Sequence, residues 1–561
     1  MENLFYAIAI VAVVMVIHDK YIQRQHQLLI NYPLIGRMRY FFEAVREPFR
    51  QYFADETFYG SKDKVDWVYS AAGGTFKFVS FSPNQPVKNP KWLIKHSNIP
   101  LNNEEVKEDF SVIFGVKRKN PFVTKSIIGR SAMSDGAISP EGTRAFSKGA
   151  YEANSPINTG EGGLTTNFIA THSVKDEKFL DVIRISEFDK TLYAFIRTFT
   201  NRFTAISYFR KKYLPKDLED TYAFDGLNRC FFRIKWDAPL EDFPDEVPDD
   251  IPDMIFQMSS GLYGVRDENG AFSEERYQKL MRFCKMTEIK LAQGAKQTGG
   301  KLVASKVTES IAYYRGVKAN ENLFSPNRFP HAKTIKDLFD FVARLQKLSD
   351  KPVGFKLVIS SREQFEEYVR EMYKRKSNGM DGVPDFISID GGDGGSATAP
   401  IFLMDSVGLS IQDAVFLADE ILKEFDLRED VKIIASSKIL TPDDVIINLS
   451  LGADFIAIAR GFMLSAGCIR ARMCSGQGSH QCPVGLATQD KKLRRSFLVH
   501  KQASKVRNYH NNLIAGVRTI LAIMGKNCTS ELHKRDLTFI DRNGFIHSDI
   551  EEYYKKKVRE S

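Results

Sequence analysis

Cysteine is scarce in this chain, with six in 561 residues. So few thiols do not make a disulfide scaffold, and their grouping is typical of free thiols in a reducing compartment. Three are isolated, Cys230, Cys284 and Cys528, and we interpret them as buried structural thiols. The other three lie within fifteen residues and raise the question of a metal or cluster site: Cys468, Cys474 and Cys482.

Several motifs that define common classes of protein are also missing. The ten histidines show no HxH or HExxH spacing, which argues against a mononuclear metal site. There is no GxSxG nucleophile elbow, and no early GxGxxG lies between a strand and a helix as a dinucleotide-binding half requires. The net charge of +9 is spread along the chain without a basic helix, so we expect no nucleic acid among the partners.

The repeated apolar runs of a multi-span membrane protein are absent, but one shorter run lies near the start. Residues 4–17 (LFYAIAIVAVVMVI) are fourteen apolar residues, short of the about 20 that a spanning helix needs. The run lacks the basic leader and cleavage site of a signal peptide, and Lys20, Arg24 and Arg37 follow it. We predict a single membrane anchor over residues 1–20, with the body of the protein in the cytoplasm. A helix buried against the rest of the protein is the alternative.

From Phe122 onward, short apolar runs bounded by glycine or polar turns alternate with amphipathic helical patterns. This alternation predicts an α/β fold with a parallel sheet. About eight strands over roughly 400 residues favour a closed (β/α)8 (TIM) barrel over an open sheet. The predicted strand segments are SIIGRSAMS, SPINTGEGG, DMIFQMSSG, TEIKLAQGAK, GFKLVISS, PDFISIDGGDGG, VKIIASSK and DFIAIARG.

We place the barrel at residues 122–525, after a helical and irregular region at 21–121 and before a C-terminal tail at 526–561. Residues 164–253 fit the alternation poorly, because they hold aromatic, mixed-charge stretches and the acidic run PLEDFPDEVPDDIPD. They are predicted to be a large insertion in one βα loop. The glycines before them suggest that the insertion leaves from the carboxyl face, where the active sites of such barrels lie.

Several strand ends carry polar, glycine-rich sequence that a plain core would not need. In SIDGGDGGSATAP, residues 388–400, glycines flank Asp393 and allow backbone N–H groups to approach an anion. Phosphate groups commonly bind after the last two strands of such barrels, where IIASSKIL and FIAIARGFM supply hydroxyl and cationic groups. A tight turn without a ligand is the alternative. The candidates are Gly391, Gly392, Gly394, Gly395, Ser437, Lys438, Arg460 and Gly461.

The segment EIKLAQGAKQTGGKL, residues 288–302, is unusually cationic for a barrel strand. A lysine within an apolar strand is costly unless it faces an anion or a polar partner. One such lysine could form a structural ion pair, whereas several indicate a pocket for an anionic cofactor and a carboxylate substrate. The candidates are Lys290, Gln293, Lys296, Lys301 and Arg315, with Glu161 of NTGEGG (158–163) able to orient a cationic amine or imine.

These motifs resemble the FMN-binding domain of glutamate synthase, specifically the stand-alone, membrane-anchored members of that family. The resemblance covers roughly residues 20–163 and 254–525, and its motifs occur in the same order. They are INTGEGG (157–163), QMSSGLYGV (257–265), EIKLAQGAK (288–296), SIDGGDGGSATAP (388–400), LGADFIAIARGFMLSAGCIRARMC (451–474) and CPVGLATQD (482–490), with the leader at 26–53 and KVRNYH (505–510).

The resemblance implies a (β/α)8 barrel that holds FMN at its carboxyl face. It also implies reduction of 2-iminoglutarate, formed from 2-oxoglutarate and ammonia, to glutamate, with electrons from an unidentified donor protein. For the cofactor, the resemblance implies Met133 and Ser134 near the flavin ring, Gln257 and Lys290 at its polar edge, and Gly391–Gly395, Lys438 and Gly461 at its phosphate. For the substrate, it implies Lys296 and Arg315 at the carboxylates of the oxo acid and Glu161 at the imine nitrogen.

The sequence departs from the family pattern at several points. It begins Met1-Glu2 rather than with the nucleophilic cysteine of a glutaminase, so no glutaminase activity is expected. Lys301 stands where a substrate-binding glutamine is typical, and Ser437 stands where the family carries a glycine. Two other interpretations therefore stay open. One is an FMN oxidoreductase acting on a different oxo or hydroxy acid, and the other is a membrane-tethered electron-transfer or scaffold subunit.

The cysteine segment also departs from the pattern. The family binds a 3Fe-4S cluster through C-x5-C-x4-C, and Cys468 and Cys474 keep the first spacing while Cys482 stands seven residues on. A loop longer by three residues could still bind a cluster if Gly476 and Gly478 let it bulge. The resemblance thus implies an iron–sulfur cluster, and a structural turn without metal is the alternative.

Overall fold

The computed structural model divides the chain into two compact units, residues 1–58 with 469–471 and residues 59–468 with 472–561. Most of residues 24–61, which we predicted to be helical and irregular, and Gly478 of the cysteine loop lie outside the described residues. The structure describes residues 2–23, 62–76, 89–169, 180–216 except 201, 222–234 except 227, 247–403 except 295 and 297–298, 406–476, 481–494 and 497–554, with short pieces between 29 and 45.

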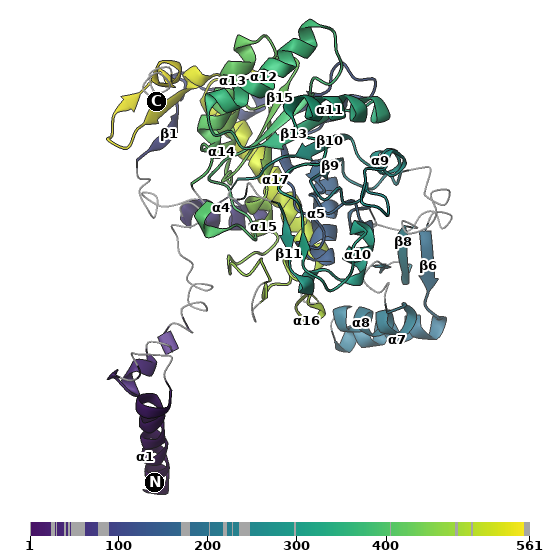
Figure 1. Cartoon of the computed structure of the whole chain (residues 1–561), viewed down its shortest axis with the longest axis vertical. Helices are drawn as coiled ribbons and strands as arrows, with labels where there is room; N and C mark the ends of the chain where they lie inside the picture. Colours follow the sequence, from purple (N-terminus) through teal and green to yellow (C-terminus); the bar gives the residue numbers. More distant parts are fainter. Residues whose placement is uncertain are drawn as a thin grey trace. The chain divides into compact units, whose positions relative to one another are not determined.

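Eight parallel strands form a closed barrel at the centre of the larger unit (Figure 1). Each predicted segment contributes one strand, so the predicted (β/α)8 fold is confirmed. Neighbours pair in chain order, and the last strand closes the ring on the first. In order round the ring the strands are β4 (Ile128–Arg130), β5 (Ile157–Asn158), β9 (Met254–Met258), β10 (Met286–Lys290), β13 (Val353–Leu357), β14 (Phe386–Asp390), β15 (Lys432–Ser436) and β16 (Phe455–Ile458).

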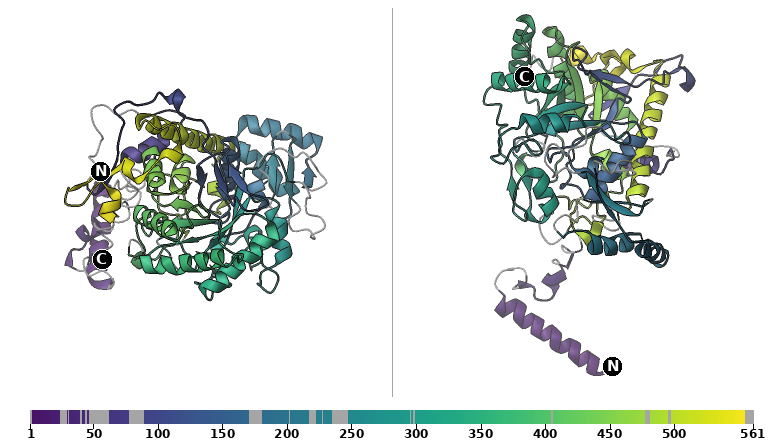
Figure 2. Two further views of the ribbon diagram at one scale, coloured as in Figure 1. Left: turned by 90° about the horizontal axis from the view of Figure 1, so that it is seen from above. Right: turned by 90° about the vertical axis from the view of Figure 1, so that its right-hand side faces the viewer.

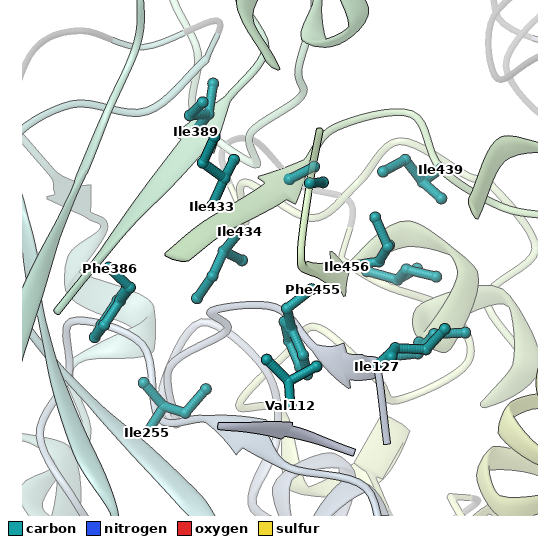
Figure 3. Packing of buried hydrophobic residues seen from close by; sticks show 14 of the residues in the cluster. Val112, Ile127, Ile255, Phe386, Ile389, Ile433, Ile434, Ile439, Phe455 and Ile456 are labelled. Carbon is teal, nitrogen blue, oxygen red and sulfur yellow. The ribbon is translucent and has the colours of Figure 1, made fainter. Parts of the chain in front are cut away.

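Apolar side chains dominate these strands because both faces of a parallel barrel are covered. Phe386, Ile434 and Phe455 belong to one continuous buried cluster (Figure 3). Side-chain caps begin most helices outside the ring; Thr334 Oγ1, for example, accepts from Asp337 N at 3.1 Å. These helices are α5 (Pro140–Glu152), α9 (Glu274–Met281), α10 (Glu309–Arg315), α11 (Ile335–Ser349), α12 (Arg362–Ser377), α13 (Ile411–Glu424), α14 (Pro442–Leu451), α15 (Arg460–Ser465) and α16 (Lys491–Arg494).

The C-terminal part of the chain packs back on the barrel. Helix α17 (Val499–Ile523) lies against α5 and α4 (Lys62–Ala72), and His510 Nε2 lies 2.9 Å from Ser126 Oγ, just before β4. Residues 526–561, predicted as a tail, contain two strands of an antiparallel three-stranded sheet, in which the first pairs with β1 and the second pairs with the first. The predicted domain boundaries stay predictions. The strands outside the barrel include β1 (Lys91–Ile94), β17 (Leu537–Ile540) and β18 (Ile546–His547), and the pairs β2 (Val112–Phe114) with β3 (Phe122–Thr124) and β11 (Lys301–Leu302) with β12 (Leu323–Phe324).

The insertion predicted between the second and third barrel strands is present and has its own core. It projects from one side of the barrel (Figure 2). Three antiparallel strands in the order β6–β8–β7 carry two helices, and the buried side chains between them include Tyr193, Phe209 and Phe231. The elements are α6 (Thr166–Ile169), β6 (Leu180–Arg184), α7 (Glu187–Phe199), α8 (Arg202–Tyr213), β7 (Ala223–Asp225) and β8 (Cys230–Ile234).

The smaller unit contains the predicted anchor. Helix α1 (Glu2–Ile17) continues into a π-helical turn, His18–Ile22. The window Phe5–Ile22 has a mean hydropathy of 1.8 and is 6% buried, so by length and composition the helix can cross a membrane. Within this unit, the buried carboxylate of Asp19 accepts a hydrogen bond of 2.8 Å from Arg37 Nε.

Candidate active site

Polar side chains gather at the carboxyl ends of the barrel strands. Glu161 follows β5, while Lys290 and Asp390 are the last residues of β10 and β14. Parallel strands bring their carboxyl ends to the same face of the barrel. Residues far apart in the sequence therefore share one site.

Glu161 and Lys290 form the central ion pair of this site. Lys290 Nζ lies 2.8 Å from Glu161 Oε2, and both side chains are mostly buried. Burial alone would raise the pKa of Glu161, but the charge and hydrogen bond of Lys290 outweigh it and lower the pKa to about 2. Glu161 is therefore a carboxylate at neutral pH, able to face a cation or to accept hydrogen bonds.

Lys296 adds a second ammonium group beside this pair. Its Nζ donates to Thr398 Oγ1 at 2.9 Å. Burial lowers its pKa; the charge of Glu161 opposes this shift, and Lys290 adds to it. Three of the candidate residues, Glu161, Lys290 and Lys296, therefore lie close together in the structure.

Arg315, at the end of α10, is buried against the loop after β4. Its Nη2 donates to the carbonyl oxygen of Asp135 at 3.1 Å, and its guanidinium lies 5.2 Å from the centre of the Tyr263 ring. Its buried Nε has no hydrogen-bond partner within the described part of the chain. Burial lowers the pKa of Arg315, partly offset by the charges of Tyr263 and Glu161. Its remaining donor capacity suits a carboxylate.

Lys301 and Gln293 lie at the margin of the cluster. Lys301 begins β11, is exposed, and has its Nζ 5.5 Å from the centre of the Phe324 ring. No described contact joins it to Glu161 or Lys290. Gln293 Nε2 lies 3.4 Å from the carbonyl oxygen of Gly395, which links the loops after β10 and β14.

Glu288, which the sequence analysis did not single out, organises the floor of the site. Its carboxylate accepts hydrogen bonds from Asn158 Nδ2 at 2.9 Å, from Gln257 Nε2 at 2.6 Å and from Ser388 Oγ. Asn158, Glu288 and Ser388 line a small cavity inside the barrel. The sequence did indicate this residue, because a carboxylate within an apolar strand needs several hydrogen-bond donors when it is buried.

Lys356 on β13 is a second residue that the sequence analysis missed. Its Nζ lies 3.4 Å from Asp390 Oδ2, and the same oxygen accepts from Gly294 N at 2.9 Å. Burial alone would lower the pKa of Lys356, but the charges of Asp390 and Glu288 raise it. Like Lys290, it lies within an apolar run, GFKLV, and a lysine there needs a polar partner.

The glycine loop after β14 meets the loops after β10 and β15. A Cβ on Gly294 would lie 1.9 Å from the carbonyl oxygen of Gly391, so only glycine fits there. Ser437 Oγ donates to Asp393 Oδ1 at 3.2 Å, and Lys438 Nζ lies 3.6 Å from Asp393 Oδ2. Three of the four predicted glycine N–H groups already donate to carbonyl oxygens: those of Gly391, Gly392 and Gly394.

Ser437 has the backbone of a glycine. Its φ of 146° and the φ of 48° at Lys438 lie in the left-handed region that side chains disfavour. The departure from the family glycine at this position therefore costs backbone strain. The turn it forms brings a hydroxyl and an ammonium group to the end of β15.

The remaining predicted flavin residues lie on neighbouring elements. Met133 follows β4, and its carbonyl oxygen accepts from Arg130 Nη1 at 3.1 Å. Ser134 is buried, 3.5 Å from Arg315 Nη2. Gly461, in α15, leaves room for Tyr509, whose hydroxyl would lie 2.0 Å from a Cβ there. Arg460, in the same helix, bonds to the side chain of Cys474.

The three clustered cysteines do not form a metal-binding group among the described residues. Cys468 and Cys482 are buried in the core, and the carbonyl oxygen of Cys468 accepts from Tyr69 Oη at 2.7 Å. Lys306 Nζ donates to the carbonyl oxygen of Cys474 at 2.6 Å. Burial raises the pKa of the Cys474 thiol, although Arg460 and Lys306 oppose the shift. The described residues therefore give a 3Fe-4S cluster no support.

The residues at the strand ends, in contrast, suit the binding of FMN. Lys290, Lys356 and Gln257 bring two ammonium groups and an amide to neighbouring strand ends, as the carbonyl oxygens of an isoalloxazine ring require. The loops after β14 and β15 supply hydroxyl, ammonium and glycine residues for a phosphate. The donor set fits FMN.

A parallel eight-stranded barrel with this donor set at its carboxyl face defines an FMN-type α/β barrel. Residues 87–527 match the family model described as the conserved region in glutamate synthase. The chain therefore belongs to the glutamate synthase family, and the family resemblance seen in the motifs is confirmed.

The chain is similar to relatives of different lengths. It is 29% identical to the glutamate synthase large subunit-like protein YerD of Bacillus subtilis, over 93% of this chain and 92% of the relative. It is 29% identical to the archaeal-type glutamate synthase (NADPH) of Thermotoga maritima, over 52% of this chain and 53% of the relative. It is 31% identical to the glutamate synthase (NADPH) large chain of Azospirillum brasilense, over 54% of this chain and 19% of the relative.

A solved structure of flavocytochrome b2 with sulfite bound is also similar. The identity is 9% and the TM-score 0.39, over 95% of this chain and 91% of that one. This likeness is too distant to carry an argument about function.

Proposed function

We propose that this protein is an FMN-dependent oxidoreductase that reduces 2-iminoglutarate, formed from 2-oxoglutarate and ammonia, to L-glutamate. The observation that carries the proposal is the Glu161–Lys290 ion pair with Lys296 and the buried Arg315 close by. This cluster combines one carboxylate with several cations, as a substrate with two carboxylates and a cationic iminium nitrogen demands.

Each residue of the cluster has a role that follows from its charge. Lys296 and Arg315 bind the two carboxylates of the oxo acid. The Nε of Arg315, which has no hydrogen-bond partner among the described residues, is a donor available for this. Glu161, ionised at neutral pH, faces the iminium nitrogen and holds it in a fixed orientation. Burial of the cluster strengthens these charged contacts by excluding water.

The cofactor itself would be held by the residues at the strand ends. Gln257, Lys290 and Lys356 would contact the polar edge of the ring, and Ser437 and Lys438 would hold the phosphate beside the glycine turn. When bound and reduced, FMN supplies a hydride. A cation near the polar edge stabilises negative charge there, which favours accepting electrons. No electron step is assigned to the three clustered cysteines, because the described residues give an iron–sulfur cluster no support.

The proposal includes the location of the protein and the sources of ammonia and electrons. Helix α1 anchors the protein in a membrane with the catalytic body in the cytoplasm, supported by the apolar window Phe5–Ile22. Ammonia comes from solution or from a partner. An unidentified donor protein supplies the electrons.

An anaerobic reoxidation experiment tests the proposal. The purified protein is loaded with FMN and photoreduced, and its visible spectrum is followed after adding 2-oxoglutarate with ammonium. We expect oxidised flavin absorbance to return with both present and not with either alone. The variant Glu161→Gln should bind flavin but reoxidise slowly. Reoxidation by pyruvate or another small acid, without response to 2-oxoglutarate, would support the alternative oxo-acid substrate.

A further inference from the structure

Arg130, the last residue of β4, is a buried cation that the described residues do not neutralise. It is 2% exposed, and no carboxylate in the described part of the chain forms an ion pair with it. Its Nε and Nη2 are buried and have no hydrogen-bond partner there either. Burial lowers the pKa of Arg130 to about 9, so the guanidinium is still charged at neutral pH. A buried charge without an anion costs free energy, so its presence calls for a reason other than stability.

The contacts that Arg130 does make fix the chain that follows it. Nη1 donates to the carbonyl oxygens of Ser131 and Met133, both at 3.1 Å. The guanidinium carbon lies 5.5 Å from the centre of the Phe146 ring and 5.9 Å from that of the Phe168 ring. Phe146 on α5 and Phe168 on α6 are fully buried, so cation–π contacts hold the guanidinium on the side of these two helices.

Residues 131–135, the β4 loop, lie at the candidate active site. Met133 and Ser134 are predicted flavin neighbours, and the carbonyl oxygen of Asp135 accepts from Arg315 Nη2 at 3.1 Å. The Met133–Ser134 peptide bond is trans, and a trans peptide directs its carbonyl and N–H groups to opposite sides. Because Arg130 binds the Met133 carbonyl, the N–H of Ser134 is turned away from α5 and α6, where it meets no acceptor within the described residues.

The loop that carries Glu161 packs closely against the β4 loop. A Cβ on Gly160 would lie 2.5 Å from Ser134 N, and a Cβ on Gly162 would lie 2.8 Å from both Ser134 Cβ and Arg315 Nη2. The β4 loop therefore cannot shift toward Glu161 without displacing Glu161 or Arg315. A residue that fixes the β4 loop also fixes the geometry of the charged cluster.

We propose that Arg130 is a positioning residue for the flavin and substrate sites. Its guanidinium holds the carbonyls of Ser131 and Met133, and so fixes the loop that would face the flavin ring and that binds Arg315. A carboxylate partner would compete for the same N–H groups, which explains why the charge is left unpaired. The identity of the cofactor rests on the proposed function, whereas the hold on the loop is a property of the chain alone.

The flavin affinity of three variants tests this inference. Arg130→Met replaces the charge by an apolar side chain that suits the surrounding aromatic rings. We expect the dissociation constant of FMN, from fluorescence titration of the full-length apoprotein, to rise about tenfold or more. Arg130→Lys keeps a charged donor and should recover part of the affinity. The matched control is Arg375→Met on α12, since Arg375 is also 2% exposed but pairs with Asp340 and Glu371, far from the β4 loop in sequence, and should leave flavin affinity unchanged.

Hydrogen exchange of the apoprotein gives a second readout that needs no ligand. In Arg130→Met we expect the amides of residues 131–135 to exchange about tenfold faster or more, with peptides elsewhere in the barrel unchanged. Unchanged exchange in the β4 loop, or an equal loss of flavin affinity in Arg130→Met and Arg375→Met, would overturn the inference. A uniform rise in exchange across the barrel would also overturn it, because Arg130 would then serve stability alone. A native protein that binds no FMN would count against the proposed function, and the exchange result would still decide the role of Arg130.

Discussion

Glu161 keeps its negative charge inside the protein because a cation lies 2.8 Å away. A buried carboxylate without such a partner would take up a proton. The cost of burying it is offset here by Lys290 and by the nearby Lys296. Substrate binding must therefore compete with an existing ion pair, which favours a substrate that itself carries both signs of charge.

Replacing Glu161 tests its role in orienting the substrate. Glu161→Gln keeps the shape but removes the charge, so we expect kcat to fall by about 10²–10³ with little loss of bound flavin. Steady-state kinetics and the flavin-to-protein ratio measure the two effects. Lys301→Met is the matched control, because Lys301 is exposed on β11 and should change kcat by less than about tenfold. Equal losses in both variants would contradict the assignment.

Gly294 is a position where a single methyl group should disturb the cofactor site. Its Cβ would lie 1.9 Å from the carbonyl oxygen of Gly391, so Gly294→Ala must separate the loops after β10 and β14. We expect flavin affinity to fall about tenfold or more, measured by fluorescence titration of the apoprotein. Gly395→Ala is the control, since a Cβ there meets nothing within 4 Å. Unchanged affinity in Gly294→Ala would show that the two loops do not shape the site.

Part of this site could be predicted from the sequence and part could not. Lys290 was visible because a lysine in an apolar strand needs a polar partner. Lys356 carried the same signal and was overlooked, and Glu288 was not recognised as an acceptor. The pairing of Lys290 with Glu161 joins residues 129 positions apart, which no local pattern encodes. Ser437 at a φ of 146° shows that a family glycine can be replaced without loss of the turn.

At the scale of elements, the barrel strands were predictable because both of their faces are buried. Apolar runs bounded by glycine therefore marked all eight. The insertion was recognised by its composition, but its fold was not, since β6 pairs with β8 over some fifty residues. The strands β17 and β18 were missed within the predicted tail because they are short, and because β17 pairs with the distant β1.

Helix α17 should confer a pH dependence through His510. Burial lowers the pKa of His510 from 6.5 to about 4, so the folded protein holds it neutral. The unfolded chain takes up a proton below pH 6.5, and stability therefore falls between about pH 6.5 and pH 4, by roughly 1.4 kcal/mol per pH unit. His510→Gln removes this slope, with the exposed His533→Gln as control. Denaturant unfolding across this range measures it, and parallel profiles for all three proteins would contradict the prediction.

At the scale of the whole molecule, the chain combines an apolar N-terminal helix with an FMN-type barrel. The helix window is 6% buried, so its apolar surface needs cover that the described residues do not supply. In the proposed function a bilayer supplies that cover.

The anchor predicts how the protein partitions. The full chain should stay in the membrane pellet after alkaline carbonate extraction, because a spanning helix is not released by removing charge contacts. Deleting residues 2–22 should move most of the protein to the supernatant. A substitution of Leu4 by alanine is the control and should leave the full chain in the pellet. Release of the full chain by carbonate would contradict a spanning anchor.

The central claim is that the cluster around Glu161 builds glutamate from an oxo acid and ammonia. The most direct test supplies the photoreduced, FMN-loaded protein with 2-oxoglutarate and nitrogen-15 ammonium under anaerobic conditions and measures the amino acid product by mass spectrometry. The account predicts nitrogen-15 L-glutamate, close to one equivalent per reduced flavin in the native protein and far less in Glu161→Gln. A reduced flavin that stays reduced, or that reoxidises without labelled glutamate, would contradict it.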